Sequence, residues 1–231
     1  MGSISRNTHQ VRSQIEEIGI VPSLRLSSAE DARFAAEAIS GAGIPLVEIT
    51  ATGPGGVEVI EALARTMPNL LVGADVVTLE MARRSVGAGA RFLTSPGFDR
   101  RIVAYAASEG IVVMPGALTP TEIIAARDAG ADFVKVFPCS PVGGARYIRA
   151  LKAPLVDVPL IAAGGVNEQT VEDFIAAGAV AVGVGTALLP RKAIRQRQPD
   201  WIAELARRFV KLVREARERR AAGPGRRGRD E

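Results

Sequence analysis

Cysteine and histidine are almost absent from this 231-residue chain. Cys139 is the single cysteine, so no disulfide can form within the chain, and a reducing cytoplasm is the compartment that fits best. His9 is the single histidine and lies in a polar N-terminal segment. The chain therefore lacks the residues for a Ser-His-Asp triad or a His-ligated zinc or iron site. We expect it to use neither a metal nor another cofactor.

Long apolar runs are absent as well. No run reaches the roughly 18 residues that suggest a membrane span, and the N-terminus lacks the apolar core of a signal peptide. We therefore expect no membrane partner. Hydrophobic residues make up 47% of the chain and charged residues 23%, which is ordinary for a globular protein. The length suits one large α/β domain or two small ones.

A net positive charge is found only in the C-terminal part of the chain. Residues 191–231 carry a net charge of +8, whereas residues 1–190 carry −4. The last stretch, 219–231, is rich in arginine and glycine, and we expect it to be disordered. An arginine-rich tail could contact nucleic acid. Because no aromatic platform accompanies these charges, we favour a solvated terminus and do not expect a nucleic-acid partner.

A repeated pattern organises the body of the chain. An alanine-rich helical segment ends in a small residue and a glycine, and an apolar run follows at once. Glycine after the last helical turn can adopt the left-handed conformation that closes a helix. Successive marker glycines lie 46, 21, 20 and 48 residues apart, so the long gaps span two units of about 22. The markers are Gly43, Gly89, Gly110, Gly130 and Gly178.

These units predict eight strands that alternate with helices. The predicted strands are Ile20–Arg25, Leu46–Thr50, Leu70–Ala74, Arg91–Ser95, Ile111–Pro115, Phe133–Phe137, Leu160–Ala163 and Ala179–Val184. The helices between them include Ala29–Ser40, Val57–Arg65, Leu79–Val86 and Thr121–Arg127. Eight such units favour a closed (β/α)8 TIM barrel over a doubly wound open sheet. No G-x-G-x-x-G follows the first strand, which weakens a dinucleotide-binding fold.

Three parts are expected along the chain. Residues 1–190 form the barrel, with a short helix at Val11–Ile18 before the first strand. Residues 191–218 form a helical extension, whose apolar positions follow one helical face and pack on the barrel or on a neighbouring subunit. Residues 219–231 form the basic tail.

One lysine stands out in the sixth predicted strand. The chain has only four lysines against twenty-five arginines, yet Lys135 lies in the middle of the apolar run 133–137. A buried ammonium is costly unless it is paired, or unless it loses its proton and acts as a nucleophile. The simpler alternative is a lysine that reaches solvent from the end of the strand or pairs with a carboxylate.

Polar residues at other strand ends favour the catalytic interpretation. The C-terminal ends of barrel strands face the active site. Glu48 lies within the apolar second strand, where it is either a structural partner for Lys135 or Arg25, or one half of a catalytic pair. In such a pair the lysine condenses with a carbonyl and the carboxylate moves protons.

Glycines follow the seventh and eighth strands. Gly164 and Gly165 come after one, and Gly183 and Gly185 with Thr186 after the other. Glycine there lets backbone N–H groups approach an anion, and the next helix N-terminus adds partial positive charge. Many barrels bind phosphate at this place, so we predict a phosphate site.

Taken together, six motifs resemble one family of enzymes, over about residues 12–190. The motifs are Val47-Glu48-Ile49-Thr50, Thr94-Ser95-Pro96-Gly97, Met114–Glu122, Phe133-Val134-Lys135-Val136-Phe137-Pro138, Gly164-Gly165-Val166-Asn167 and Gly183-Val184-Gly185-Thr186-Ala187. With these motifs the chain resembles the 2-keto-3-deoxy-6-phosphogluconate (KDPG) and 4-hydroxy-2-oxoglutarate (KHG) aldolases, including the phosphogalactonate relatives.

The resemblance implies a class I aldolase barrel that usually forms a trimer. It makes Lys135 the residue that forms a Schiff base with pyruvate and Glu48 the general acid and base. Arg25 would bind substrate anions and Phe137 would line the pocket. The backbone at Gly164, Gly165, Gly185 and Thr186 would hold the phosphate. The candidate substrate-binding residues are Arg25, Thr50, Thr52, Asp75, Val76, Pro96, Phe137 and Ala163.

The chain departs from the family pattern at three places. Members usually read Gly-Ala-Gly-Thr after the third strand, where the threonine contacts pyruvate, but here the residues are Gly73-Ala74-Asp75-Val76. Thr52 replaces an arginine that some members use, and Ala163 replaces a threonine before the double glycine. We therefore expect Schiff-base chemistry with an altered substrate preference and fewer hydroxyl contacts to the substrate.

The expected reaction is reversible aldol cleavage of a 2-keto-3-deoxy sugar acid 6-phosphate to pyruvate and glyceraldehyde 3-phosphate. One alternative is a pyruvate aldolase with a different, unphosphorylated acceptor, or a biosynthetic condensation. Another is a non-catalytic oligomeric barrel that only binds phosphorylated ligands.

Overall fold

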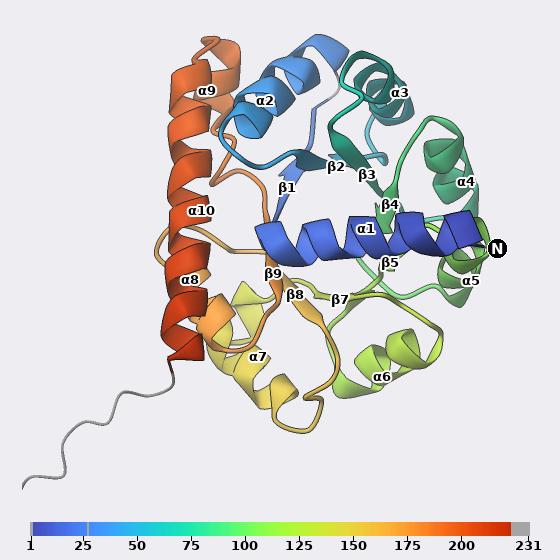
Figure 1. Ribbon diagram of the computed structural model, residues 1–231, viewed down its shortest axis with the longest axis vertical. Helices are drawn as coiled ribbons and strands as arrows, with labels where there is room; N and C mark the ends of the chain where they lie inside the picture. Colours follow the sequence, from blue (N-terminus) through green and yellow to red (C-terminus); the bar gives the residue numbers. More distant parts are fainter. Residues whose placement is uncertain (1, 27, 223–231) are drawn as a thin grey trace, which may run out of the picture.

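The computed structural model describes residues 2–26 and 28–222, with side chains from residue 8 onward. The chain forms a barrel of parallel strands surrounded by helices (Figure 1). The strands are β1 Ile20–Leu24, β2 Leu46–Thr50, β3 Leu71–Asp75, β4 Phe92–Thr94, β5 Val112–Met114, β6 Gly116–Ala117, β7 Val134–Val136, β8 Leu160–Ala163 and β9 Ala181–Val184. They lie in the order β5-β4-β3-β2-β1-β9-β8-β7-β6.

The fifth barrel strand is divided at Pro115, because proline has no N–H to donate to a ladder. Its first half, β5, pairs with β4, and its second half, β6, pairs with β7. The Pro115 carbonyl also accepts a hydrogen bond from the Lys135 amide (2.9 Å). The two ends of the sheet are therefore consecutive pieces of one segment, so the sheet closes on itself. The predicted barrel is confirmed, and the open sheet is excluded.

Helices cover the outside of the barrel, as the repeat predicts. They are α1 Gly2–Ile18, α2 Ala29–Gly41, α3 Gly56–Thr66, α4 Leu79–Gly87, α5 Arg100–Glu109, α6 Pro120–Asp128, α7 Ala145–Lys152, α8 Val171–Ala176, α9 Arg191–Arg195 and α10 Pro199–Ala221, with a 3₁₀ turn at Ser140–Val142. All five marker glycines have positive φ, which confirms their predicted role after the helix ends. In the described ranges, no helix is long and apolar enough to span a bilayer.

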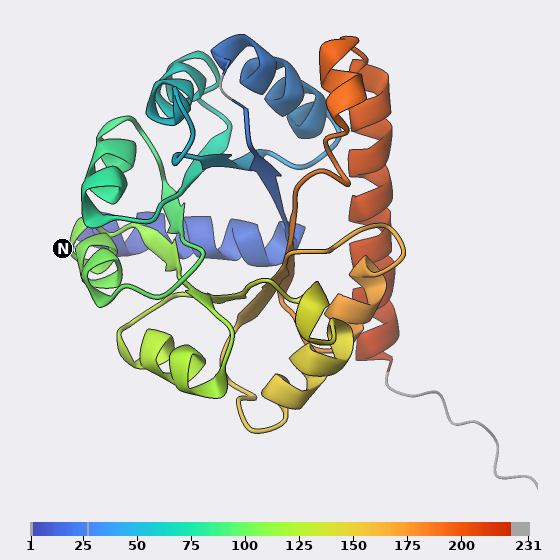
Figure 2. The same cartoon turned by 180° about the vertical axis from the view of Figure 1, so that it is seen from behind.

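Helix α1 lies across the N-terminal end of the barrel strands (Figures 1 and 2). Its Val11 and Ile15 side chains are buried, and the Arg12 guanidinium lies 5.4 Å from the centre of the Phe133 ring. Because α1 covers this end, it separates the barrel interior from solvent there. The helix begins at Gly2, so the predicted start at Val11 is wrong.

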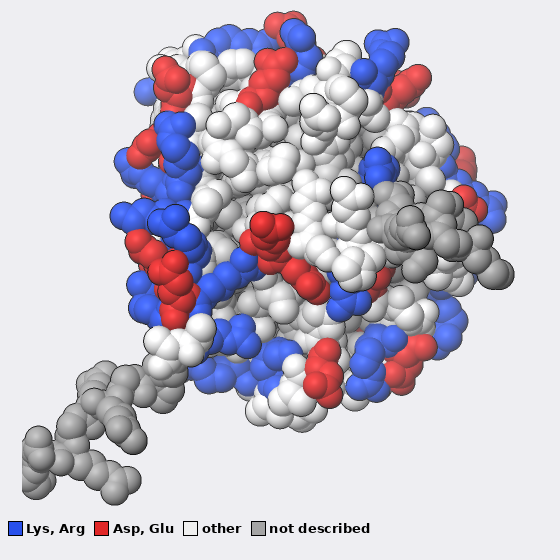
Figure 3. Space-filling model, in the orientation of Figure 1, with Lys and Arg blue, Asp and Glu red and all other residues white. Residues whose placement is uncertain are grey.

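Helix α10 packs along α8 and α2 on the outside of the barrel (Figure 1). Its buried residues Ile202, Leu205, Phe209 and Val213 follow one face, and charges of both signs lie along its outer side (Figure 3). The helix continues to Ala221, where disorder was predicted from residue 219, because Arg219 pairs with Glu172 of α8 (2.6 Å). Residues 223–231 of the predicted tail lie outside the described residues. The domain boundary at residue 190 stays a prediction.

The interior of the barrel is filled below the strand ends. The Phe92 ring is fully buried beside Gly73 of the neighbouring strand, and a Cβ on that glycine would lie 2.1 Å from the ring. Glycine at this place therefore makes room for an aromatic ring inside the barrel. With α1 covering one end and Phe92 filling space inside the barrel, the polar strand residues gather at the C-terminal end.

Candidate active site

A cavity of about 390 Å³ opens at the C-terminal ends of the strands. Side chains from β1, β2, β3, β4, β7 and β8 line it, together with the glycines after β8 and β9. This is the end of a parallel barrel at which active sites are built. The cavity is large enough for a small phosphorylated metabolite, since ligand pockets begin at about 300 Å³.

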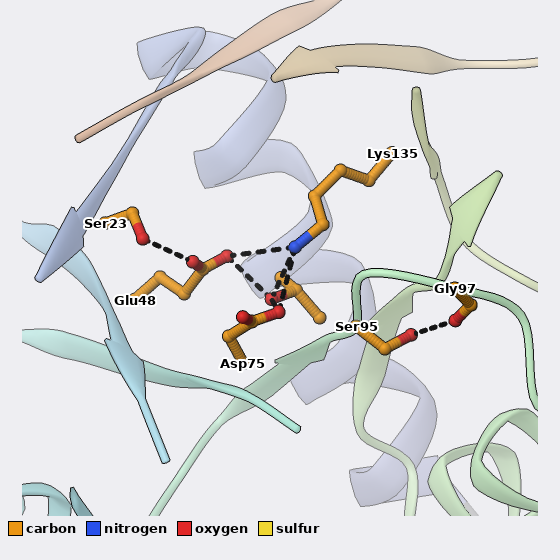
Figure 4. Close-up of polar contacts among 7 residues, drawn as sticks. Ser23, Glu48, Asp75, Ser95, Gly97 and Lys135 are labelled. Carbon is orange, nitrogen blue, oxygen red and sulfur yellow. Dashed lines mark hydrogen bonds and ion pairs between the residues drawn. The ribbon is translucent and has the colours of Figure 1, made fainter. Parts of the chain in front are cut away.

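Lys135 points into this cavity from the middle of β7 (Figure 4). The residue is only 8% exposed. Its Nζ lies 2.9 Å from Asp75 Oδ1 and 3.9 Å from Glu48 Oε2. Lys135 therefore does not reach into solvent, because carboxylates within the cavity pair with it.

Glu48 is held in place from two sides. It is 5% exposed; its Oε1 accepts a hydrogen bond from Ser23 Oγ (2.8 Å), and its Oε2 accepts one from Thr94 Oγ1 (2.6 Å). Ordered donors on both oxygens restrict the carboxylate to one orientation, facing the lysine. Of the two structural partners considered for Glu48, the structure pairs it with Lys135.

Asp75 and Thr94 complete the cluster because strand register brings them together. Asp75 ends β3 and is paired with Thr94 at the end of β4. Thr94 Oγ1 lies 3.0 Å from Asp75 Oδ1 and 3.2 Å from Lys135 Nζ. Sequence reasoning chose Pro96 on this strand and missed Thr94, as it missed Ser23 on β1. Each lies two residues before a predicted site residue, so strand alternation was the signal that could have found it.

Glycines form the wall predicted to bind phosphate. Gly164 and Gly165 both have positive φ, and a Cβ on Gly165 would lie 2.2 Å from the Ser140 side chain. Gly185 and Thr186 line the same cavity. The structure therefore brings the two predicted glycine segments together at one side of the site.

A second cavity of about 490 Å³ adjoins this wall. It shares Ser23, Arg25, Gly185 and Thr186 with the first cavity, and Arg191 and Arg195 of α9 extend its lining. Asp31, the acidic residue of its lining, already pairs with Arg197 (2.9 Å). Arg25, Arg191 and Arg195 have no acidic partner in the part of the chain that the structure describes, so this cavity favours anions.

Four other candidates for substrate binding line the catalytic cavity, namely Thr52, Pro96, Phe137 and Ala163. The Phe137 ring is partly exposed, with its centre 5.8 Å from Lys135 Nζ. The structure does not bring Thr50 or Val76 to the cavity lining; both are buried. Val76 alternates with Asp75, whose side chain reaches Lys135, so Val76 faces the other side of the chain.

Cys139 does not compete with Lys135 as a nucleophile. Its side chain is fully buried, and its Sγ donates to the Val136 carbonyl (2.9 Å). Burial raises the pKa of this thiol to about 11, so it stays protonated near neutral pH. No group of three or more potential metal-ligating His, Cys, Asp or Glu residues occurs within residues 2–26 and 28–222.

Comparison with known proteins places these residues in context. Residues 11–205 match the family model of the KDPG and KHG aldolases. The chain belongs to the KDPG and KHG aldolase family. It is 30% identical over 200 residues to the 2-dehydro-3-deoxy-phosphogluconate aldolase of Treponema pallidum, which covers 86% of this chain and 95% of that protein.

Two further relatives extend the comparison. The KHG/KDPG aldolase of Escherichia coli is 29% identical over 192 residues, or 83% of this chain and 90% of that protein. The crystal structure of the Legionella pneumophila KDPG aldolase has a TM-score of 0.80 at 28% identity and covers 85% of this chain and 96% of that one. It contains pyruvate captured as a covalent carbinolamine. Membership in the family confirms the resemblance drawn from the motifs.

Proposed function

We propose that this protein is a Schiff-base aldolase that reversibly cleaves KDPG to pyruvate and glyceraldehyde 3-phosphate. The observation that carries the proposal is a buried amine, Lys135, that faces the cavity. Its Nζ lies 3.9 Å from Oε2 of the fixed Glu48 carboxylate. Family membership supports it, because a relative captures pyruvate covalently as a carbinolamine. A barrel that only binds ligands has no need for a lysine in this position.

Lys135 is the proposed nucleophile. Its neutral amine attacks the C2 carbonyl of the substrate, and the carbinolamine loses water to form an imine. The protonated imine accepts the electron pair when the C3–C4 bond breaks, which releases the aldehyde and leaves an enamine. Glu48 removes the proton of the C4 hydroxyl and later returns a proton to C3. Water then hydrolyses the pyruvyl imine and frees Lys135.

Anion binding is proposed for the part of the cavity lined by Arg25 and the two glycine segments. Arg25 binds substrate anions, and the backbone at Gly164, Gly165, Gly185 and Thr186 binds the phosphate. The adjoining arginine cavity supports this placement, because Arg191 and Arg195 add positive charge beside Gly185 and Thr186. Phe137, Pro96, Thr52 and Ala163 shape the space for the substrate carbons. Asp75 fixes the position of the amine that the substrate must reach.

We also propose that the protein forms a homotrimer and is located in the cytoplasm. The resemblance to the aldolases supports the trimer, and the single buried cysteine is compatible with a reducing compartment. Sedimentation equilibrium of the full chain tests the oligomeric state, and a mass other than three chains would overturn the trimer.

Borohydride trapping tests the reaction. The protein is treated with pyruvate and sodium borohydride, and we expect one reduced pyruvyl group on the peptide that contains Lys135. Lys152 is an internal control: burial lowers its pKa, but it donates to the Val156 and Val158 carbonyls outside the cavity. Folded protein without an adduct, or with an adduct on Lys152 alone, would contradict the proposal.

Asp75 favours a second candidate, aldol cleavage with a different acceptor. A carboxylate in the cavity, 16% exposed at its side chain, alters the field that an anionic substrate meets. Comparing kcat/KM for KDPG and for unphosphorylated KHG decides between the two substrates. Turnover of neither, with phosphate still bound by both the native protein and Lys135→Ala, would favour the binding-only barrel.

A further inference from the structure

The Thr94 hydroxyl has more partners than one hydroxyl can donate to. Its Oγ1 lies 2.6 Å from Glu48 Oε2, 3.0 Å from Asp75 Oδ1 and 3.2 Å from Lys135 Nζ. A hydroxyl donates one proton and accepts up to two. The Thr94 oxygen can accept a hydrogen bond from the Lys135 ammonium. Its single proton can be donated either to Glu48 Oε2 or to Asp75 Oδ1, because both oxygens are within hydrogen-bond distance. Thr94 therefore links both carboxylates to the amine.

Asp75 is nearer to the amine than Glu48 is. The Nζ–carboxylate distance is 2.9 Å for Asp75 and 3.9 Å for Glu48, and only the first is within hydrogen-bond range. Both oxygens of Glu48 already accept hydrogen bonds from Ser23 and Thr94. A proton that leaves Lys135 therefore meets Asp75 first, and it reaches Glu48 through Thr94.

Burial favours transfer through side chains. Thr94 is 2% exposed, Glu48 5% and Lys135 8%, so solvent has little access to the atoms between the amine and Glu48. Side chains in hydrogen-bond contact can carry a proton where bulk water cannot enter. The usual family pattern has glycine at the position of Asp75, so this path belongs to this chain rather than to the general aldolase mechanism.

We propose that Asp75 is the base that deprotonates Lys135 and that Thr94 relays the proton to Glu48. The inference rests on the proposed aldolase function, because it concerns the step that makes the amine nucleophilic. Asp75 and Thr94 are both catalytic residues here, since both contact the reacting nitrogen: Asp75 takes the proton, and Thr94 passes it on.

The step balances without an outside reactant. The N–H bond of the ammonium breaks and the proton passes to Asp75 Oδ1, which leaves a neutral amine and a carboxylic acid. Asp75 then gives a proton to Thr94 Oγ1 as Thr94 gives its own to Glu48 Oε2. As the amine forms its bond to the substrate carbonyl carbon, the C=O π electrons move to the oxygen, which takes one proton from the nitrogen and becomes the carbinolamine hydroxyl. Protonated Glu48 then donates to this hydroxyl, which leaves as water while the nitrogen lone pair forms the protonated imine, and Glu48 is again a carboxylate.

Pre-steady-state trapping tests the role of Asp75. Native protein, Asp75→Asn and Asp75→Gly are mixed with pyruvate and quenched with borohydride at increasing times. We expect both variants to form the Lys135 adduct about 100-fold more slowly, in the range of general acid–base effects. Their rates should rise further with pH than the native rate, because hydroxide replaces the lost base. The matched control is Asp132→Asn, the same change just before β7 and away from the catalytic cavity, which should react at the native rate.

Exchange of the pyruvate methyl protons with deuterated water tests Thr94, because it reports protonation by Glu48 without an aldehyde. We expect Thr94→Val to slow the exchange about tenfold at unchanged pyruvate affinity, and Thr94→Ser to restore it, since a relay needs only the hydroxyl. Circular dichroism confirms the folding of each variant.

The outcomes separate the two proposals. A native protein without adduct overturns the aldolase function itself. If folded Asp75→Asn or Asp75→Gly forms the Lys135 adduct as fast as the native protein does, the proposed role of Asp75 is wrong, and Asp75 is only an ion-pair partner. If Thr94→Ser fails to restore exchange, Thr94 acts through packing and the relay is wrong.

Discussion

The segment around β7 carries one charged side chain toward each end of the barrel: Asp132 precedes the strand, and Lys135 lies within it. The two side chains are held differently. Near the end covered by α1, Asp132 accepts a hydrogen bond from the Val113 amide (2.9 Å), and Arg12 of α1 lies close enough to act on its charge. At the open end, the Lys135 amine is hydrogen-bonded to side chains of other strands, Asp75 and Thr94. A side chain bonded to backbone fixes the strand, whereas a cluster of side chains can exchange protons. One end therefore contributes stability and the other chemistry.

The largest effect that this comparison predicts is at Lys135. Lys135→Ala should lower aldol cleavage by about 10³-fold or more while the fold is kept, because no other group supplies a neutral amine to the substrate. Lys152→Ala, at the C-terminal end of α7, is the matched control and should keep native activity. Steady-state kinetics on KDPG measures both. Substantial residual turnover in Lys135→Ala would show that the amine at the open end of the barrel is not required for catalysis.

The second effect concerns stability at the covered end. Ile15 is fully buried between α1 and the barrel, so Ile15→Ala should lower the free energy of unfolding by about 2–4 kcal/mol. We expect kcat and KM to stay native below the melting temperature. Urea unfolding and kinetics on the same sample test this. A loss of activity at full stability would show that the covered end takes part in catalysis.

A smaller effect is expected in the arginine cavity. Replacing both Arg191 and Arg195 by alanine should raise KM for a phosphorylated substrate about tenfold at low salt, and the difference should shrink as salt screens the charges. The kcat value and the KM for an unphosphorylated substrate should change little. Arg214→Ala on the outer side of α10 is the control for loss of positive charge. Equal changes for both substrates would contradict anion selectivity in this cavity.

The smallest effect is the pH dependence of stability at Asp132. Burial is the main cause that raises the pKa of this carboxyl above its usual value. The folded state therefore binds a proton at a higher pH than the unfolded state does. As pH falls through the folded-state pKa, the native protein should gain stability relative to Asp132→Asn. Melting temperatures of both proteins between about pH 4 and 6 test the sign, and a native protein that loses stability relative to Asp132→Asn on acidification would contradict it.

Much of the fold followed from local patterns. The glycines that end helices were recognised because left-handed residues are nearly always glycine, and the strands after them agree with prediction within two residues. The break at Pro115 was not predicted, since it depends on which neighbour each half of the strand pairs with. The extra length of α1 was also missed, because residues 2–10 have no apolar period of their own.

The site residues that could be predicted are those whose own position in a strand is unusual. Lys135 and Glu48 could be chosen because each is a charge within an apolar run. Ser23 and Thr94 were missed because hydroxyls are common in strands and carry no such signal. Val76 was chosen from the family pattern, although alternation with Asp75 puts it on the other side of the chain.

The sequence by itself determined the barrel, the family and the two central side chains, because periodicity and strand-end chemistry are encoded over a few residues. Tertiary structure alone decided how those side chains meet. Ser23, Glu48, Asp75, Thr94 and Lys135 come from five different strands, and their contacts join residues up to 87 positions apart, as in the pair of Lys135 and Glu48. Register and closure set such distances, and these depend on the packing of the whole barrel rather than on any single segment.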